Sequence, residues 1–176
     1  MLRLALLLIA GTAVLFAAPV AAATDQVDLS VGMKTLPLLT SKIEGMATVA
    51  IIYDPAVPAS RDEAAGIKAV LDGEFVAPGD LKITALLVPA NNLGKMAGSK
   101  IAVLTSGLNG YYDAIDAAAR AGNVLTMSTD LDCVRANKCV LGIVSKPHVE
   151  IYYSKIAADA AKIGFASAFT MLAKQI

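Results

Sequence analysis

Residues that could bind a ligand follow four apolar, β-branched segments of this sequence. After each segment come side chains with hydroxyl, amide or carboxylate groups, and one tyrosine adjoins them. If the four segments are parallel strands, these side chains gather at the carboxyl edge of the sheet, where open α/β sheets bind their ligands. The predicted binding rim consists of Asp54, Asn91, Asn92, Ser106, Asn109, Tyr111, Ser128, Asp130 and Asp132.

Two parts of this rim suggest a specific chemistry. Residues 105–107, Thr-Ser-Gly, precede a predicted helix and could offer backbone N–H groups to an anion. No Walker lysine and no Gly-x-Gly-x-x-Gly run accompanies them, so an ordinary turn is favoured.

Asp130 and Asp132 could form a carboxylate pair or part of a cation site. Two carboxylates do not supply the six to eight oxygen ligands that calcium prefers, so solvated loop acids are favoured.

The sequence gives little support for catalysis. His148 is the only histidine and follows Pro147 in a predicted turn, where we interpret it as a surface residue. No Gly-x-Ser-x-Gly elbow is present, and a nucleophile, a base and an orienting group do not occur together. We therefore expect no enzyme activity, no cofactor and no metal.

Cys133 and Cys139 are the only cysteines, with five residues between them. In an oxidising compartment this spacing favours a disulfide that closes a short loop. The pair lacks the Cys-x-x-Cys spacing of redox enzymes, so a static staple is favoured over a catalytic dithiol. A redox-regulatory role for this disulfide stays an open alternative.

Strands and helices alternate along the chain and must position the rim. Residues 24–32 are expected to be irregular. Ser60 and Glu63 are expected to form a capping box at the start of a helix. Gly122 is expected to end the next long helix in a left-handed conformation. Residues 145–148 are read as a hairpin turn between two strands. Strands are predicted at 47–53, 81–88, 100–104, 123–127, 139–144 and 149–153, and helices at 33–43, 60–71, 91–96, 109–120, 155–162 and 166–174.

This order predicts an α/β fold, a three-layer sandwich with a flavodoxin-like, mostly parallel sheet and a terminal antiparallel hairpin. The expected strand order is near 2-1-3-4 with a variable edge. A single domain is expected over residues 24–176, with no second domain and no linker.

Residues 1–23 resemble a secretory signal peptide. Arg3 precedes an apolar run, Pro19 interrupts it, and alanines at 21–23 form a small-residue cleavage pattern before Thr24. An uncleaved membrane anchor is the competing interpretation, because the run approaches the length that spans a bilayer. Pro19 and the alanines argue against an anchor. We predict cleavage near Ala23 and a periplasmic location.

The charge balance excludes two classes of partner. The sequence has 15 Lys and Arg against 15 Asp and Glu, and removal of Arg3 with the signal leaves 14 basic residues. A nearly neutral chain without a basic run has no electrostatic footprint for nucleic acid or for an anionic membrane surface.

From residue 47 onward, and most of all over residues 124–176, the chain resembles the YfiR-like family of periplasmic proteins. The resemblance is carried by Val-Leu-Thr-Met-Ser-Thr-Asp at 124–130, two following strands, an alanine-rich helix, and Ala-Ser-Ala-Phe-Thr-Met-Leu-Ala at 166–173. Two departures stand out: Ser154 replaces a common Asn, and an aromatic segment ending in Trp-Pro is absent. The missing segment leaves the family's amino-terminal partner surface without a counterpart.

This resemblance implies a function without catalysis. Family members are associated with restraint of a membrane-bound diguanylate cyclase through its periplasmic part, and they can carry disulfides that support the fold. We therefore expect a membrane partner with a periplasmic sensor domain, with self-association as an open alternative. The rival hypothesis is a solute-binding protein that resembles one lobe of an ABC transporter substrate-binding protein.

Overall fold

A computed structural model describes residues 23–73 and 75–176 of the chain. The predicted signal peptide therefore lies outside the described residues, apart from Ala23. No helix in the described ranges is long and apolar enough to cross a membrane. The strands are β1 Met46–Tyr53, β2 Lys82–Pro89, β3 Ile101–Leu104, β4 Leu125–Ser128, β5 Leu141–Val144, β6 Glu150–Tyr153 and β7 Lys174–Gln175.

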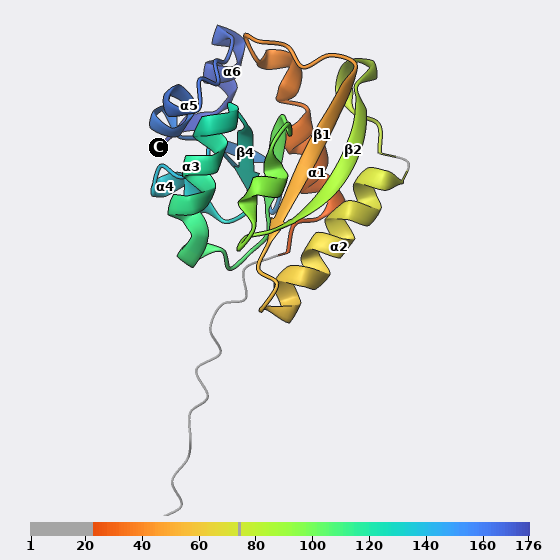
Figure 1. The fold of residues 1–176 in the computed structure, drawn as a ribbon. Coiled ribbons are helices and arrows are strands. Elements are labelled where there is room, and N and C mark those ends of the chain that lie inside the picture. The colour runs from red at the N-terminus through yellow and green to blue at the C-terminus, as the bar shows by residue number, and fades with distance from the viewer. Residues whose placement is uncertain (1–22, 74) are drawn as a thin grey trace, which may run out of the picture.

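Helices alternate with the first five strands (Figure 1). The α-helices are α1 Gln26–Met33, α2 Pro58–Asp72, α3 Tyr112–Gly122, α4 Leu131–Arg135, α5 Lys155–Ala160 and α6 Ser167–Leu172. Short 3₁₀ helices are η1 Leu36–Leu38, η2 Pro78–Asp80, η3 Leu93–Met96 and η4 Asn109–Tyr111.

The strands form one sheet in the order β2-β1-β3-β4-β5-β6-β7. All neighbouring strands run parallel except β5 and β6, which pair antiparallel from Leu141↔Tyr153 to Val144↔Glu150. This arrangement confirms the predicted α/β three-layer sandwich, its 2-1-3-4 order and its terminal hairpin. The two-residue edge strand β7 was not predicted.

Apolar side chains cover both faces of the sheet, as the long apolar strands require. Along β1, Val49 and Ile51 point to the face covered by α1, α2, α5 and α6. Ala50 and Ile52 point to the opposite face, which η3, α3 and α4 cover. Figure 1 shows α2 running along β1 and β2, with α3 and α4 on another side of the sheet. These two apolar layers hold the strand ends in fixed relative positions.

The amino-terminal region differs from the prediction. Residues 26–33 form α1, which begins with a capping box: the Asp25 side chain accepts from the N–H of Asp28, and Asp28 accepts from the N–H of Asp25. The prediction that this region is irregular was therefore wrong. The capping box was not recognised in the sequence because Asp28 stands where this motif usually has Glu. The predicted helix over 33–43 was also wrong, since only η1 forms around Pro37, which lacks the N–H that a longer helix needs.

Three smaller corrections concern the helices. Helix α2 begins at Pro58, whose fixed φ suits a first helical position, so Ser60 does not cap it. The left-handed residue after α3 is Asn123, with φ of 50°, and Gly122 is still helical. Residues 131–135 form α4 inside the segment that was predicted as a loop.

Candidate binding rim

The carboxyl ends of β1, β3 and β4 lie side by side and bring part of the predicted rim to one edge of the sheet. Ile52 in β1 is level with Leu104 in β3, and Leu104 is level with Ser128 in β4. The segments that follow these strands therefore meet at one edge of the sheet. Asn91, Asn92 and Asn109 are exposed and stand outside the hydrogen-bond network described below.

Glu63 is the centre of this network, although sequence reasoning assigned it only to a capping box. The residue is 8% exposed and lies in the second turn of α2, facing the strand ends. Its Oε1 accepts from the backbone N–H of Thr24 at 2.9 Å and from Thr24 Oγ1 at 2.7 Å. Its Oε2 accepts from the backbone N–H of Ser106 at 2.9 Å. One carboxylate thus joins α2, the start of the described chain and the loop after β3.

One signal in the sequence could have identified Glu63. It precedes Ile67 by four residues, so it lies on the apolar face of α2. A carboxylate in that stripe must be buried, and a buried carboxylate needs hydrogen-bond donors from another element.

Ser60 makes a second link between α2 and the strand ends. Its Oγ accepts from the backbone N–H of Asp54 at 2.9 Å and lies 2.7 Å from Thr105 Oγ1. Thr105 Oγ1 is also 3.1 Å from the carbonyl oxygen of Ile52. Ser60 and Thr105 are buried, so these bonds fix the loops after β1 and β3 against α2.

At the end of β4, Asp130 is held by neighbours on both sides. Its backbone N–H donates to Ser128 Oγ at 3.0 Å, and its Oδ1 accepts from the N–H of Asp132, which caps α4. Tyr112, which was not among the predicted rim residues, donates its hydroxyl to Asp130 Oδ2 at 2.6 Å. Burial first, and then this hydrogen bond, raise the pKa of Tyr112 well above its usual value, so the hydroxyl stays protonated.

Asp132 pairs with a cation of its own helix rather than with the Asp130 network through its side chain. Its carboxylate is exposed and pairs with Arg135 at 3.0 Å. In residues 23–73 and 75–176, no group of three or more His, Cys, Asp and Glu side chains could hold a metal ion.

An open groove of about 340 Å³ extends the rim toward the hairpin. On one side, Asp25 pairs with Lys146 of the β5–β6 turn at 2.6 Å. The hydrogen bond from Lys146 lowers the pKa of Asp25 to about 2. The groove is lined by Asp25, Asp28, Asp130, Asp132, Arg135 and Lys146 together with apolar and hydroxyl side chains. Charges of both signs therefore face its interior.

A second open groove, of about 450 Å³, lies at the opposite, amino edge of the sheet. Lys42, Lys100 and Lys162 line it with Glu44, and all four side chains are exposed. It contains none of the predicted rim residues, because they follow the strands and this groove precedes them.

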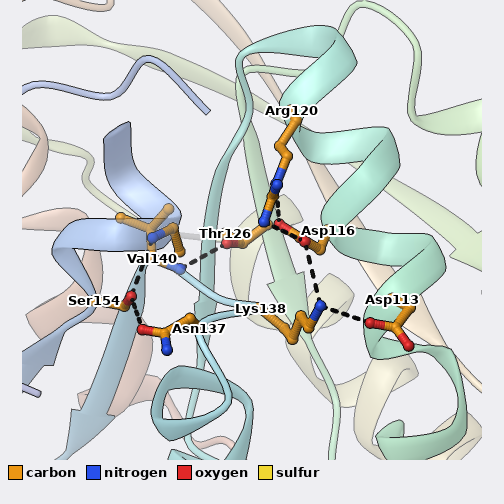
Figure 2. A network of polar contacts seen from close by, with 9 residues as sticks. Asp113, Asp116, Arg120, Thr126, Asn137, Lys138, Val140 and Ser154 are labelled. Carbon is orange, nitrogen blue, oxygen red and sulfur yellow. Dashed lines mark hydrogen bonds and ion pairs between the residues drawn. The ribbon is translucent and has the colours of Figure 1, made fainter. Parts of the chain in front are cut away.

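The Cys133–Cys139 disulfide is formed, as predicted, and both residues are fully buried. Figure 2 shows how polar contacts hold the loop that it closes. Lys138 pairs with Asp113 at 2.6 Å and lies 3.8 Å from Asp116, both on α3. Asn137 accepts from Ser154 Oγ at 2.6 Å. The hydrogen bond from Lys138 lowers the pKa of Asp113. The loop is thus tied to α3 and to the start of α5.

Comparisons with known proteins give a fold and no family. No family model matches the sequence, and no curated protein matches it. A Streptococcus pneumoniae protein described as an ABC domain in complex with L-Trp is similar in structure, with a TM-score of 0.58, 12% identity and coverage of 84% of this chain. A conserved domain protein from Vibrio cholerae has a TM-score of 0.56, 13% identity and coverage of 85%. This chain matches only 59% and 60% of their respective lengths.

Proposed function

We propose that this protein is a periplasmic, non-catalytic binding protein that restrains a membrane-bound signalling protein of the diguanylate cyclase type by direct contact. The resemblance to YfiR-like proteins, strongest over residues 124–176, suggests the class of partner. The buried disulfide suits an oxidising compartment, in keeping with the predicted signal peptide.

The observation that carries the proposal is a set of exposed apolar side chains at the edge of the sheet formed by β6 and β7. Because these strands are parallel, residues that precede them lie at the same end of the edge. Val149 precedes β6 and is 57% exposed, while Met171 and Leu172 precede β7 and are 81% and 71% exposed. Exposed apolar side chains that gather beside a short edge strand are typical of a protein contact surface.

The same edge suits an extended partner segment. Strand β7 covers only Tyr152 and Tyr153 of β6, so the first half of β6 has no strand beyond it. A partner strand could add there through its backbone and place apolar side chains against Met171 and Leu172.

The rim also supports a protein partner over a small enclosed ligand. Thr24 occupies the space between α2 and the ends of β3 and β4, through its bonds to Glu63 and a 3.2 Å contact with Thr129 Oγ1. A ligand in that position would have to displace the chain's own residue.

The test is capture of the partner by the purified, oxidised chain, residues 24–176, from detergent-solubilised membranes. We expect a membrane protein with a cyclase domain to be retained, and its synthesis of cyclic di-GMP to fall when the protein is added. The double variant Met171→Glu/Leu172→Glu should lose both effects. Val76→Glu is the matched control, since Val76 is 89% exposed at a distant position. Absence of any cyclase, or equal retention by the double variant, would refute the proposal.

A solute-binding function is the second candidate, favoured by the groove beside Asp25 and Lys146 and by the structural similarity to a protein whose description includes L-Trp. Carboxylates and cations in one groove could hold the ammonium and carboxylate of an amino acid. Thermal-shift measurements with L-Trp and the other amino acids test this function. A shift that Lys146→Gln abolishes would support it, and no shift at millimolar concentrations would exclude it.

A further inference from the structure

The Glu63 carboxylate is buried and receives three hydrogen bonds, and all three come from uncharged groups. Within residues 23–73 and 75–176, no Lys, Arg or His nitrogen lies within 4.0 Å of it. Removing a carboxylate from water costs several kcal/mol unless a cation or strong donors offset the cost. Three neutral donors offset part of this cost, and a positive charge at this position would offset more of it.

The backbone nitrogen of Thr24 is the group best placed to supply it. This nitrogen lies 2.9 Å from Glu63 Oε1, and the side chain of Thr24 is fixed by bonds to Glu63 and Thr129. Thr24 is also the first residue after the cleavage position predicted from the alanines at 21–23. Geometry and sequence pattern thus point independently to the same atom.

We propose that the mature chain begins at Thr24 and that its α-ammonium is the built-in ligand of Glu63. A signal peptidase hydrolyses the Ala23–Thr24 peptide bond with one water, leaving a carboxylate on Ala23 and an amine on Thr24 that takes up a proton. The neutral N–H donor becomes an ammonium paired with a buried carboxylate. Cleavage would thus convert an existing hydrogen bond into an ion pair, and this ion pair contributes nothing to folding before the signal is removed.

The charged groups around this position favour an ammonium. Asp25, the N-cap of α1, and Asp28 in its first turn lie one and four residues from Thr24, and Asp130 lines the neighbouring groove. The amino end of α1 disfavours a positive charge, and its two carboxylates offset that effect. Lys146 is the nearby cation, and it is already paired with Asp25.

Two versions of the wild-type chain test the proposal. One starts at Thr24, and the other keeps Ala23 and carries an added Gly-Ser before it, so its Thr24 nitrogen is an uncharged amide. At pH 7 we expect the unfolding equilibrium constant of the first to be at least fivefold smaller in urea titrations. Glu63→Gln should remove this difference, whereas Glu44→Gln, at an exposed glutamate, should retain it.

The pH dependence has a defined sign. An α-amine has a pKa of about 7.7–8.0 in the unfolded chain, and pairing with a carboxylate raises it in the folded chain. The added stability should be complete below about pH 7.7 and disappear as the pH rises through the folded-state value.

The intact mass of the exported protein provides the first measurement. A mature chain that starts anywhere other than Thr24 would overturn the proposal. So would equal unfolding constants for the two wild-type versions, a comparison that does not need Glu63→Gln to fold. A difference that persists in a folded Glu63→Gln variant would assign the effect to another carboxylate and also overturn it.

Discussion

Removal of the disulfide by the double substitution Cys133→Ala/Cys139→Ala should destabilise the protein by about 2 kcal/mol. The cysteines are six positions apart, and the chain-entropy relation gives about 2 kcal/mol for a closed loop of about seven residues. Alanine avoids the buried hydroxyl that serine would introduce.

Urea unfolding followed by circular dichroism provides the assay, with the oxidised wild type as the reference. The variant should unfold at a lower urea concentration with a slope close to that of the wild type. Lys138→Gln is the informative companion, because it removes the contact with Asp113 and leaves the disulfide intact. Since Asp113 is 89% exposed and Lys138 is half-buried, solvent screens this pair, and its loss should change stability far less. A double variant as stable as the wild type would refute the reasoning and indicate that the polar contacts alone hold the loop.

Three further predictions concern single side chains. Tyr112→Phe removes the hydrogen bond to Asp130 and should cost about 1–3 kcal/mol in urea unfolding; no loss would show that this bond does not stabilise the end of β4. The lowered pKa of Asp25 stabilises the fold above about pH 4, and this contribution is lost as the pH falls toward about 2. Asp25→Asn should therefore flatten that part of the acid-unfolding curve. The change in unfolding free energy should be no more than about 1 kcal/mol, because the Asp25–Lys146 pair is partly exposed. Gly142→Ala would place a Cβ 2.6 Å from a side-chain carbon of Leu131 and should lower stability by about 1–3 kcal/mol; an unchanged melting temperature would contradict this packing.

The order of strands was predictable because the core of the sheet is buried on both faces. Such strands appear in the sequence as short, continuous apolar runs bounded by glycine, proline and polar residues, and β1 and β3 are of this kind. Short connections and right-handed crossovers then leave few possible arrangements. Strand β7 escaped prediction because two residues carry no periodic pattern, and its position depends on pairing with β6.

The rim was only partly predictable, for a different reason. The strand ends could be located, and Ser128 and Asp130 do lie in the network there. Glu63 and Ser60 were assigned to a local motif of α2, whereas the structure uses them for contacts more than 40 residues away in sequence, with Ser106 and Thr105. Pro58 decided this outcome by starting the helix two residues earlier. Local patterns could not reveal that choice.

The rim and the β6–β7 edge differ in what their side chains contact. Because of this difference, a loss of partner binding can be distinguished from a loss of stability. Glu63, Ser60 and Asp130 bond to other parts of the chain, so substitutions there should first lower the stability of the fold. Met171 and Leu172 are exposed, so their substitution should leave stability unchanged and alter only partner binding. A variant of the β6–β7 edge that keeps its unfolding midpoint and loses the partner would place recognition there. Loss of the partner only in rim variants that are also destabilised would instead indicate that binding needs the intact fold.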